Sequence, residues 1–361
     1  MLIAPWSHRG TVDAVVMLSG GNRVKRRKFV FLTGAALTAP AHQWLVHDPG
    51  PLVSGLSGRR ISVGLVNRLT PMIAELRAMD DAVGGGDVFS LSQYHFGWVA
   101  GLLNKASYDD ATGRKLHSTL AELGQLLGWV CYDTGQHGLA QRYYITALRA
   151  AHAADDRPLG AHILGSMAYQ AVRQGCPAEA VTLIETAVMG IRGKQTSRLL
   201  AELYLRQAYA FADLKDSSAC ITAISQARTH VERAAKDDEL AYLYWVRPAV
   251  ITSGTGDCLL QLGQADRAVA LINQGIAMFD APFDRDRQLY LTDLAEAFAR
   301  PGKHRDLESA AGKAIEAIQL AENLSSTRSV DRIRYLIQLM KQYANFPPVR
   351  DFLEQARSFA V

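Results

Sequence analysis

Apolar and small residues recur along most of the chain at the spacing of helices. The stretch GWVCYDTGQHGLAQRYYITAL places such residues at Gly128, Gly135, Ala140, Tyr144 and Ala147. Four further stretches repeat this spacing, beginning at Ala168, Ala208, Gly256 and Ala295, and the last of them matches it least closely. Because apolar residues three and four positions apart share one face of a helix, each stretch predicts two helices joined by a short turn.

Each mark in the pattern has a physical role. The small residues at the first and third marks let two antiparallel helices cross closely. Glycine at the second mark ends the first helix in a left-handed turn, which a Cβ atom disfavours. The third stretch has Lys215 at this mark, and the fifth has Leu307 at the third mark. We therefore expect five helix pairs, the last of them the least regular.

The pattern G-x₆-G-x₄-A-x₃-Y-x₂-A of the first stretch resembles the tetratricopeptide repeat (TPR). The resemblance covers about residues 116–320, and the first three units are spaced by 40 residues, more than the usual length of about 34. It implies an all-α fold: a right-handed superhelical solenoid of TPR-like helix pairs with N- and C-terminal helical caps. The predicted array occupies residues 110–322.

Both flanks of the array are predicted to be helical. Residues 61–106 read as an N-terminal helix pair around VGGGD, and residues 326–361 read as capping helices interrupted by Pro347 and Pro348. Solenoids need such end pieces to cover their last apolar face.

Positive charge is concentrated before the array. Residues 1–60 hold eight of the 39 Lys and Arg residues but only two of the 35 Asp and Glu residues, so the remainder is slightly acidic. The body therefore gives no sign of a nucleic-acid surface. We expect residues 1–22 to be disordered and residues 23–60 to form a basic linker with a short apolar segment.

The stretch NRVKRRKFVFLTGAALTAP, which starts at Asn22, has three interpretations. Followed by helices and TPR-type units, it resembles the linker of Xre-type helix-turn-helix transcriptional regulators, whose repeats form a sensory and dimerising part. RRKFVFL also looks like a twin-arginine export signal, with removal near Ala41. A DNA-contacting arm ranks third, because a few charges without a fold bind weakly. Residues 1–22 are too short for a helix-turn-helix domain, so DNA would be bound only through a domain outside this sequence.

Motifs for catalysis are absent from the sequence. It contains no HExxH, GxxxxGK[ST] or GxSxG, and its four cysteines lie far apart, beside packing marks. We expect a protein that is not an enzyme and that needs neither cofactor nor metal.

Recognition remains, and the repeat register predicts where it occurs. The residues that directly follow the first mark are Trp129, Tyr169, Tyr209, Asp257 and Glu296. The same face should also carry Glu122, Gln125, Tyr132, His162, Arg173 and Arg300. Three aromatic residues followed by two acids suit a peptide or small organic ligand, although packing between neighbouring helices would explain the aromatics equally well. The cluster YLYWVRP, Tyr242 to Pro248, is either packing or rim.

The favoured hypothesis is a cytoplasmic regulatory protein. It would bind a peptide, a small molecule or a protein in a concave groove, without a membrane, and pass the change to a homodimer. The alternatives are an exported TPR scaffold and a cytoplasmic TPR adaptor without a DNA role.

Overall fold

The computed structural model describes residues 5–19, 30–48, 58–234, 240–279, 283–303 and 305–360. Within these ranges the protein is helical throughout, and its one β-type contact is an isolated bridge between Arg60 and Ser107. The predicted all-α class is confirmed.

The helices of the array pack in adjacent pairs, as the repeat pattern predicts. The pairs are α6 (Asp110–Asp133) with α7 (His137–Ala153), α8 (Arg157–Arg173) with α9 (Pro177–Gly190), α10 (Ser197–Asp213) with α11 (Ser217–Arg233), α12 (Pro248–Gln261) with α13 (Ala265–Ala277), and α14 (Asp284–Ala299) with α15 (Leu307–Ala321).

The turns between paired helices follow the second mark. Gly135, Gly175 and Gly263 adopt φ values of 76°, 75° and 76°, the left-handed conformation open to glycine. Lys215 adopts φ 62° at the equivalent position. The fifth pair differs from the prediction, because Gly302 is not left-handed and Pro301 instead follows the end of α14.

Glycine at the first mark brings the paired helices together. A Cβ atom on Gly128 would lie 2.4 Å from the ring of Tyr144, and one on Gly256 would lie 2.4 Å from Ile272. The first and fourth marks of one unit are therefore direct neighbours in space. The repeated spacing in the sequence therefore reflects a direct contact between the two helices of each pair.

The flanking elements are also helices. Three precede the array: α3 (Val63–Asn67), α4 (Leu69–Val83) and α5 (Gly85–Lys105). Two follow it, α16 (Thr327–Met340) and α17 (Pro347–Gln355), with 3-10 turns at Lys341–Tyr343 and Ala356–Phe359. A further 3-10 turn, η2, covers Ala241–Leu243 before α12.

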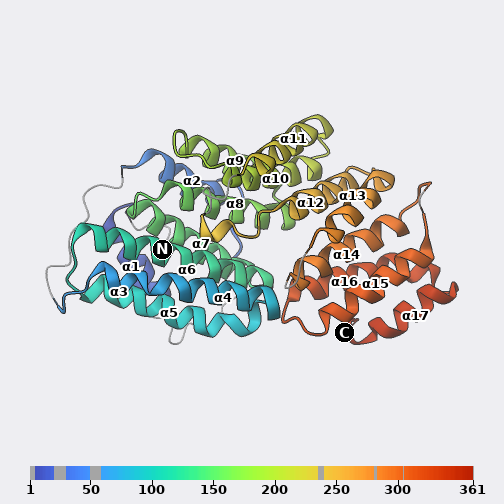
Figure 1. Ribbon diagram of the computed structural model, residues 1–361, viewed down its shortest axis with the longest axis horizontal. Coiled ribbons are helices and arrows are strands. Elements are labelled where there is room, and N and C mark those ends of the chain that lie inside the picture. The colour runs from blue at the N-terminus through green and yellow to red at the C-terminus, as the bar shows by residue number, and fades with distance from the viewer. Residues whose placement is uncertain are drawn as a thin grey trace.

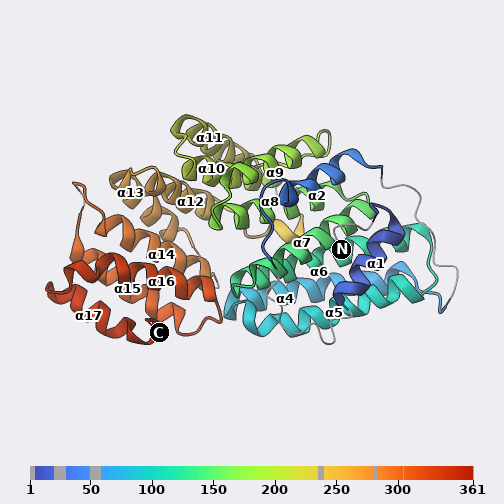
Figure 2. The same ribbon diagram turned by 180° about the vertical axis from the view of Figure 1, so that it is seen from behind.

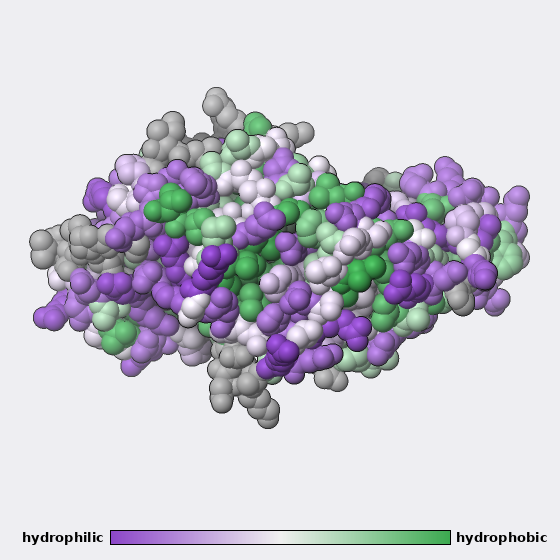
Figure 3. Space-filling model, turned by 90° about the horizontal axis from the view of Figure 1, so that it is seen from above, coloured by the Kyte–Doolittle hydropathy of each residue, from purple (hydrophilic) through white to green (hydrophobic). Residues whose placement is uncertain are grey.

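The pairs follow an arc whose far end returns to its beginning. Figure 1 shows α14 to α16 (orange) facing the edge of α4 and α5 (cyan), with α8 to α13 spanning the distance between them. The backbone joins the two ends, since Ser325 N–H donates to Val83 at 2.8 Å and Gly86 N–H donates to Ser325 at 3.3 Å. On the face that carries α9 and α11, apolar side chains are visible mainly toward the middle (Figure 3).

The N-terminal segment differs from the expectation of disorder over residues 1–22. His8–Ser19 form helix α1, which packs against α5 and α7 and buries Val12 and Val15 (Figure 2). The expectation was wrong here because an apolar face of α1 meets the outer surface of the array.

The segment 23–60 is likewise more than a linker. Ala35–Val46 form helix α2, whose Trp44 is fully buried between α8 and α9. A Cβ atom would lie 2.4 Å from the indole at Gly160 and 2.3 Å from it at Gly190, so these glycines form the slot for Trp44. The basic residues between Asn22 and Lys28 lie outside the described residues.

Candidate functional site

A cavity of about 360 Å³ lies at the centre of the arc. Its lining comes from the first helices of all five units (α6, α8, α10, α12 and α14), from η2 and the segment after it, and from α4 and α16. The first helices face inward, as in the groove that the repeat register predicts. Helices α4 and α16 border the space on the side that a groove would leave open.

The predicted aromatic residues meet in this cavity. The rings of Trp129 and Tyr169 stack with centroids 6.0 Å apart, and Tyr209 follows Tyr169 at 5.7 Å. Tyr132 stands edge-on to Tyr169 at 5.8 Å. Trp129 and Tyr169 are half-buried, so part of each ring stays open to the cavity. Aromatic residues 40 positions apart in the sequence therefore form a continuous row in space. Their rings pack against one another and also line the cavity.

Three guanidinium groups surround the ring of Tyr169. The Cζ atoms of Arg206 and Arg173 lie 4.2 and 5.2 Å from its centroid, and Arg328 donates to its hydroxyl at 3.4 Å. Burial raises the pKa of Tyr169, but Arg173, Arg328 and Arg206 together outweigh burial and bring the pKa below its ordinary value. The three positive charges around Tyr169 therefore favour the ionised form of its hydroxyl.

Most of these cations have a carboxylate partner. Arg173 Nη2 lies 2.5 Å from Asp257 Oδ2, and both of these residues belong to the face predicted from the repeat register. Arg328 Nε lies 3.1 Å from Asp133 Oδ1, and Arg332 contacts Asp293. Arg206 has no carboxylate partner among the described residues.

The remaining predicted residues divide into two groups. Gln125 and His162 line the cavity, and His162 Nδ1 lies 2.8 Å from Glu202. Glu122, Glu296 and Arg300 lie outside the lining. Glu122 pairs with Arg77 at 3.0 Å, and Glu296 pairs with Arg300 at 2.5 Å. These residues therefore act behind the lining. Glu122 and Glu296 pair with the lining residues Arg77 and Arg332, and Arg300 pairs with Glu296 at the end of α14.

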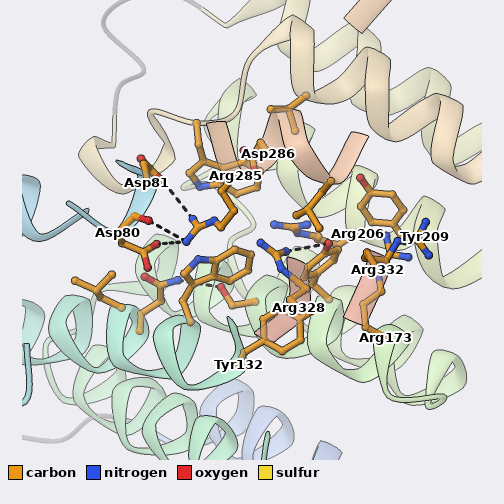
Figure 4. Close-up of a pocket in the computed structure, with 18 of the residues that line it drawn as sticks. Asp80, Asp81, Tyr132, Arg173, Arg206, Tyr209, Arg285, Asp286, Arg328 and Arg332 are labelled. Atoms are coloured by element: carbon orange, nitrogen blue, oxygen red, sulfur yellow. Dashed lines mark hydrogen bonds and ion pairs between the residues drawn. The ribbon is translucent and has the colours of Figure 1, made fainter. Parts of the chain in front are cut away.

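The opposite end of the cavity carries the acidic residues Asp80 and Asp81 (Figure 4). Arg285 reaches across from α14, with its Nη1 atom 2.8 Å from Asp80 Oδ2 and 3.9 Å from Asp133 Oδ2, and its Nη2 atom 3.3 Å from Asp81 Oδ1. Tyr244 donates its hydroxyl to Asp81. We call Arg285, Asp80, Asp81 and Asp133 the clasp, since they tie α14 to α4 and α6.

Burial raises the pKa of two carboxyl groups that line the cavity. It raises the pKa of Asp81 to about 7, against the opposing effects of Arg285 and Tyr244. It likewise raises the pKa of Asp293 to about 7, although Arg332 acts to lower it. Both carboxyl groups therefore titrate near neutral pH.

Several lining residues escaped sequence reasoning. Arg206 lies three positions before Tyr209, within the same helical face, and an i−3 reading of the register would have found it. Tyr242, Tyr244 and Trp245 line the cavity from the YLYWVRP cluster, whose sequence is equally compatible with packing and with a position at the rim. Arg285, Arg328 and Arg332 had no sequence signal, because they reach the cavity only through the return of the arc.

The sequence matches no protein-family model, and a search of curated proteins found no significant relative. Among the described residues, no group of three or more His, Cys, Asp or Glu side chains is arranged to hold a metal ion. None of the helices in the described ranges combines the length and apolar character needed to cross a bilayer.

Proposed function

We propose that this chain is the ligand-sensing part of a transcriptional regulator of the Xre type, and that it binds its ligand without transforming it. In this proposal the helix pairs form a right-handed superhelical solenoid of TPR-like units. The ligand occupies the central cavity, and DNA is bound through a helix-turn-helix domain outside this sequence. The protein acts in the cytoplasm, and a homodimer transmits the signal.

The observation that carries the proposal is the cavity lined by the aromatic row. Its volume of about 360 Å³ lies at the lower end of the range for small-molecule sites, about 300–1,000 Å³. Such a space holds a small molecule or one or two side chains of a peptide, but no folded partner. Among the partners expected from the sequence, the size favours a small ligand.

The contacts of α2 support retention of the N-terminal segment over an exported form. Removal of the chain near Ala41 would cut α2 and separate Leu37 from its buried position beside the array. Leu32 would also lose its two hydrogen bonds with the side chain of Gln141, at 2.6 and 3.0 Å. A segment that is buried and hydrogen-bonded in this way serves folding better than cleavage.

A thermal-shift screen of metabolites and short peptides tests ligand binding. We expect at least one compound to raise the melting temperature, and the double variant W129A/Y169A to lose this response. The variant Y94A, with a ring that is 70% exposed on α5, is the matched control and should respond like the wild type. An unchanged response in W129A/Y169A would refute binding in the cavity.

A gel shift tests the DNA part of the proposal. The chain alone should give no sequence-specific complex, because its basic residues before α2 would supply only salt-sensitive phosphate contacts. A tight specific complex of this chain with DNA would contradict the assignment of DNA binding to another domain.

A further inference from the structure

The further inference concerns Arg206, which is buried in the cavity wall without a counter-charge. Arg206 is 6% exposed, and its Nε atom has no hydrogen-bond partner. No hydrogen bond from its Nη atoms to another described residue is found, and the residue lines the cavity. Arg206 lies among the side chains that line the cavity (Figure 4).

Aromatic rings hold this guanidinium in place. Its Cζ atom lies 4.2 Å from the ring centroid of Tyr169 and 4.8 Å from that of Trp245. Cation–π contacts of this kind fix the plane of an arginine but leave its N–H groups free to donate. A buried charge without a partner destabilises a fold, so its retention here calls for a partner that the chain itself does not provide.

The surroundings of Arg206 favour an anion. Arg173 lies over the ring of Tyr169 and Arg328 donates to its hydroxyl, and the Nη2 atom of Arg328 is also buried without a hydrogen-bond partner. The other five arginines of the lining each contact a carboxylate, so Arg206 is the one lining arginine without such a partner among the described residues. One unpaired guanidinium fits a single negative charge.

The geometry of the guanidinium fork fits a carboxylate or a phosphate, and the single unpaired charge favours a carboxylate over a divalent phosphate. A guanidinium presents two parallel N–H groups that match the two oxygens of a carboxylate. Eight aromatic side chains line the same space, among them Trp129, Tyr169 and Trp245. Flat apolar surface next to one carboxylate site suits an aromatic body.

We propose that the ligand is a small aromatic carboxylic acid whose carboxylate binds Arg206, with Arg173 and Arg328 beside it. This inference rests on the proposed ligand-binding function and assigns its chemical class. The same carboxylate could belong to a free organic acid or to the C-terminus of a short peptide, and the cavity volume favours the free acid.

Isothermal titration calorimetry with matched probes tests the assignment. The first arm pairs a panel of aromatic acids, such as indole-3-acetate, with their neutral amides and with the cation tryptamine. The second arm uses the tripeptide Gly-Gly-Trp with a free or an amidated C-terminus. Phenyl phosphate tests a divalent anion. We expect the free acids to bind best and the amides about tenfold or more weakly.

Two variants locate the effect at Arg206. R206M should reduce acid binding about tenfold or more, while R206K, which keeps the charge without the fork, should give an intermediate loss. R247M is the control, since Arg247 also stacks on an aromatic ring, with Cζ 3.8 Å from the Phe283 centroid, but lies outside the lining. Without ligand, R206M should melt at or above the wild-type temperature, because it removes an unpaired buried charge.

The outcomes separate this inference from the proposed function. Equal or tighter binding of amides, tryptamine or phenyl phosphate would overturn the carboxylate assignment and leave ligand binding intact. Tighter binding of Gly-Gly-Trp with a free C-terminus than of the free aromatic acids would show that the bound carboxylate is a peptide C-terminus. If no acid binds but another compound stabilises the wild type and not W129A/Y169A, the inference fails and the proposed function stands. A lower melting temperature of free R206M with unchanged acid binding would reduce Arg206 to a structural role.

Discussion

At the scale of single residues, the turn of the third unit carries backbone strain. Lys215 takes φ 62° where the first, second and fourth units have glycine at 75° or 76°. A left-handed conformation costs a residue other than glycine about 1–2 kcal/mol. Glycine avoids this cost, but it also loses more chain entropy on folding, so the net gain from glycine is smaller. Lys215 therefore adopts the backbone conformation that the repeat requires, although its side chain disfavours it.

Replacing Lys215 with glycine should stabilise the protein. We expect K215G to raise the free energy of unfolding by about 0.5–1 kcal/mol, measured by urea denaturation. G175A provides the reverse control, because a Cβ there meets nothing within 4 Å but must adopt φ 75°. A destabilised K215G would show that the hydrogen bond of Lys215 Nζ to Gln261, 2.5 Å long, outweighs the strain.

Asp81 should make stability depend on pH. Its pKa is about 7 in the fold, above the ordinary value of 3.8, so the folded state holds a proton that the unfolded state releases. The contribution of Asp81 to stability is therefore present below pH 4 and is lost as pH rises toward 7. D81N keeps a neutral side chain at this place and should gain stability relative to the wild type as pH rises from 5 to 8.

Denaturation of both proteins at pH 5 and pH 8 measures this difference. The histidines with lowered pKa titrate in both proteins, so their effect cancels in the comparison. A constant difference between D81N and the wild type would mean that Asp81 stays ionised through its contact with Arg285.

At the scale of elements, Trp44 is the largest buried side chain of helix α2. Trp44 is 0% exposed and fills the slot between Gly160 and Gly190, and Arg157 donates to its carbonyl oxygen at 2.6 Å. W44A should lower the free energy of unfolding by about 3–5 kcal/mol, since the slot cannot close over the missing indole. V46A, which alters a 55% exposed residue of the same helix, should have little effect. Equal effects of the two variants in urea denaturation would mean that α2 does not contribute to the core.

The sequence predicted the elements whose signals are local. Each helix pair depends on contacts within one unit, such as Gly128 with Tyr144, and these recur with a period that can be read directly. Helices α1 and α2 were missed because their partners are distant. Trp44 depends on Gly160 and Gly190, and neither glycine identifies itself as the side of a slot for residue 44.

The candidate site was predictable to the same extent. Trp129, Tyr169 and Tyr209 were found because stacking follows the repeat period. Arg285 and Arg328 were not, because α14 and α16 reach α4 and α6 only when the whole arc returns on itself. The structure therefore has a central cavity where the sequence predicts an open groove. Ion pairs between distant residues close its border, and such pairs produce no regular spacing that could be recognised in the sequence.

At the scale of the whole molecule, the clasp determines whether the arc stays closed. Arg285 is 4% exposed and compensates three carboxylates from α4 and α6, and removing one partner of a buried ion pair costs about 3–5 kcal/mol. In R285M, Asp80 and Asp133 would be left with less compensation in a buried place. Separation of α14 from α4 would let water reach both groups.

We therefore expect R285M to open the arc. Its radius of gyration in small-angle scattering should increase, and amide hydrogen exchange at residues 325–332 should accelerate, because Ser325 pairs with Val83 and Gly86 across the same junction. R287M removes an exposed arginine from the same helix and should leave both measurements unchanged. If R285M keeps the wild-type radius and exchange rates, the backbone pairing at Ser325 is sufficient for closure. If the arc opens, loss of acid binding in the same variant would show that the closed form is the one that holds the ligand.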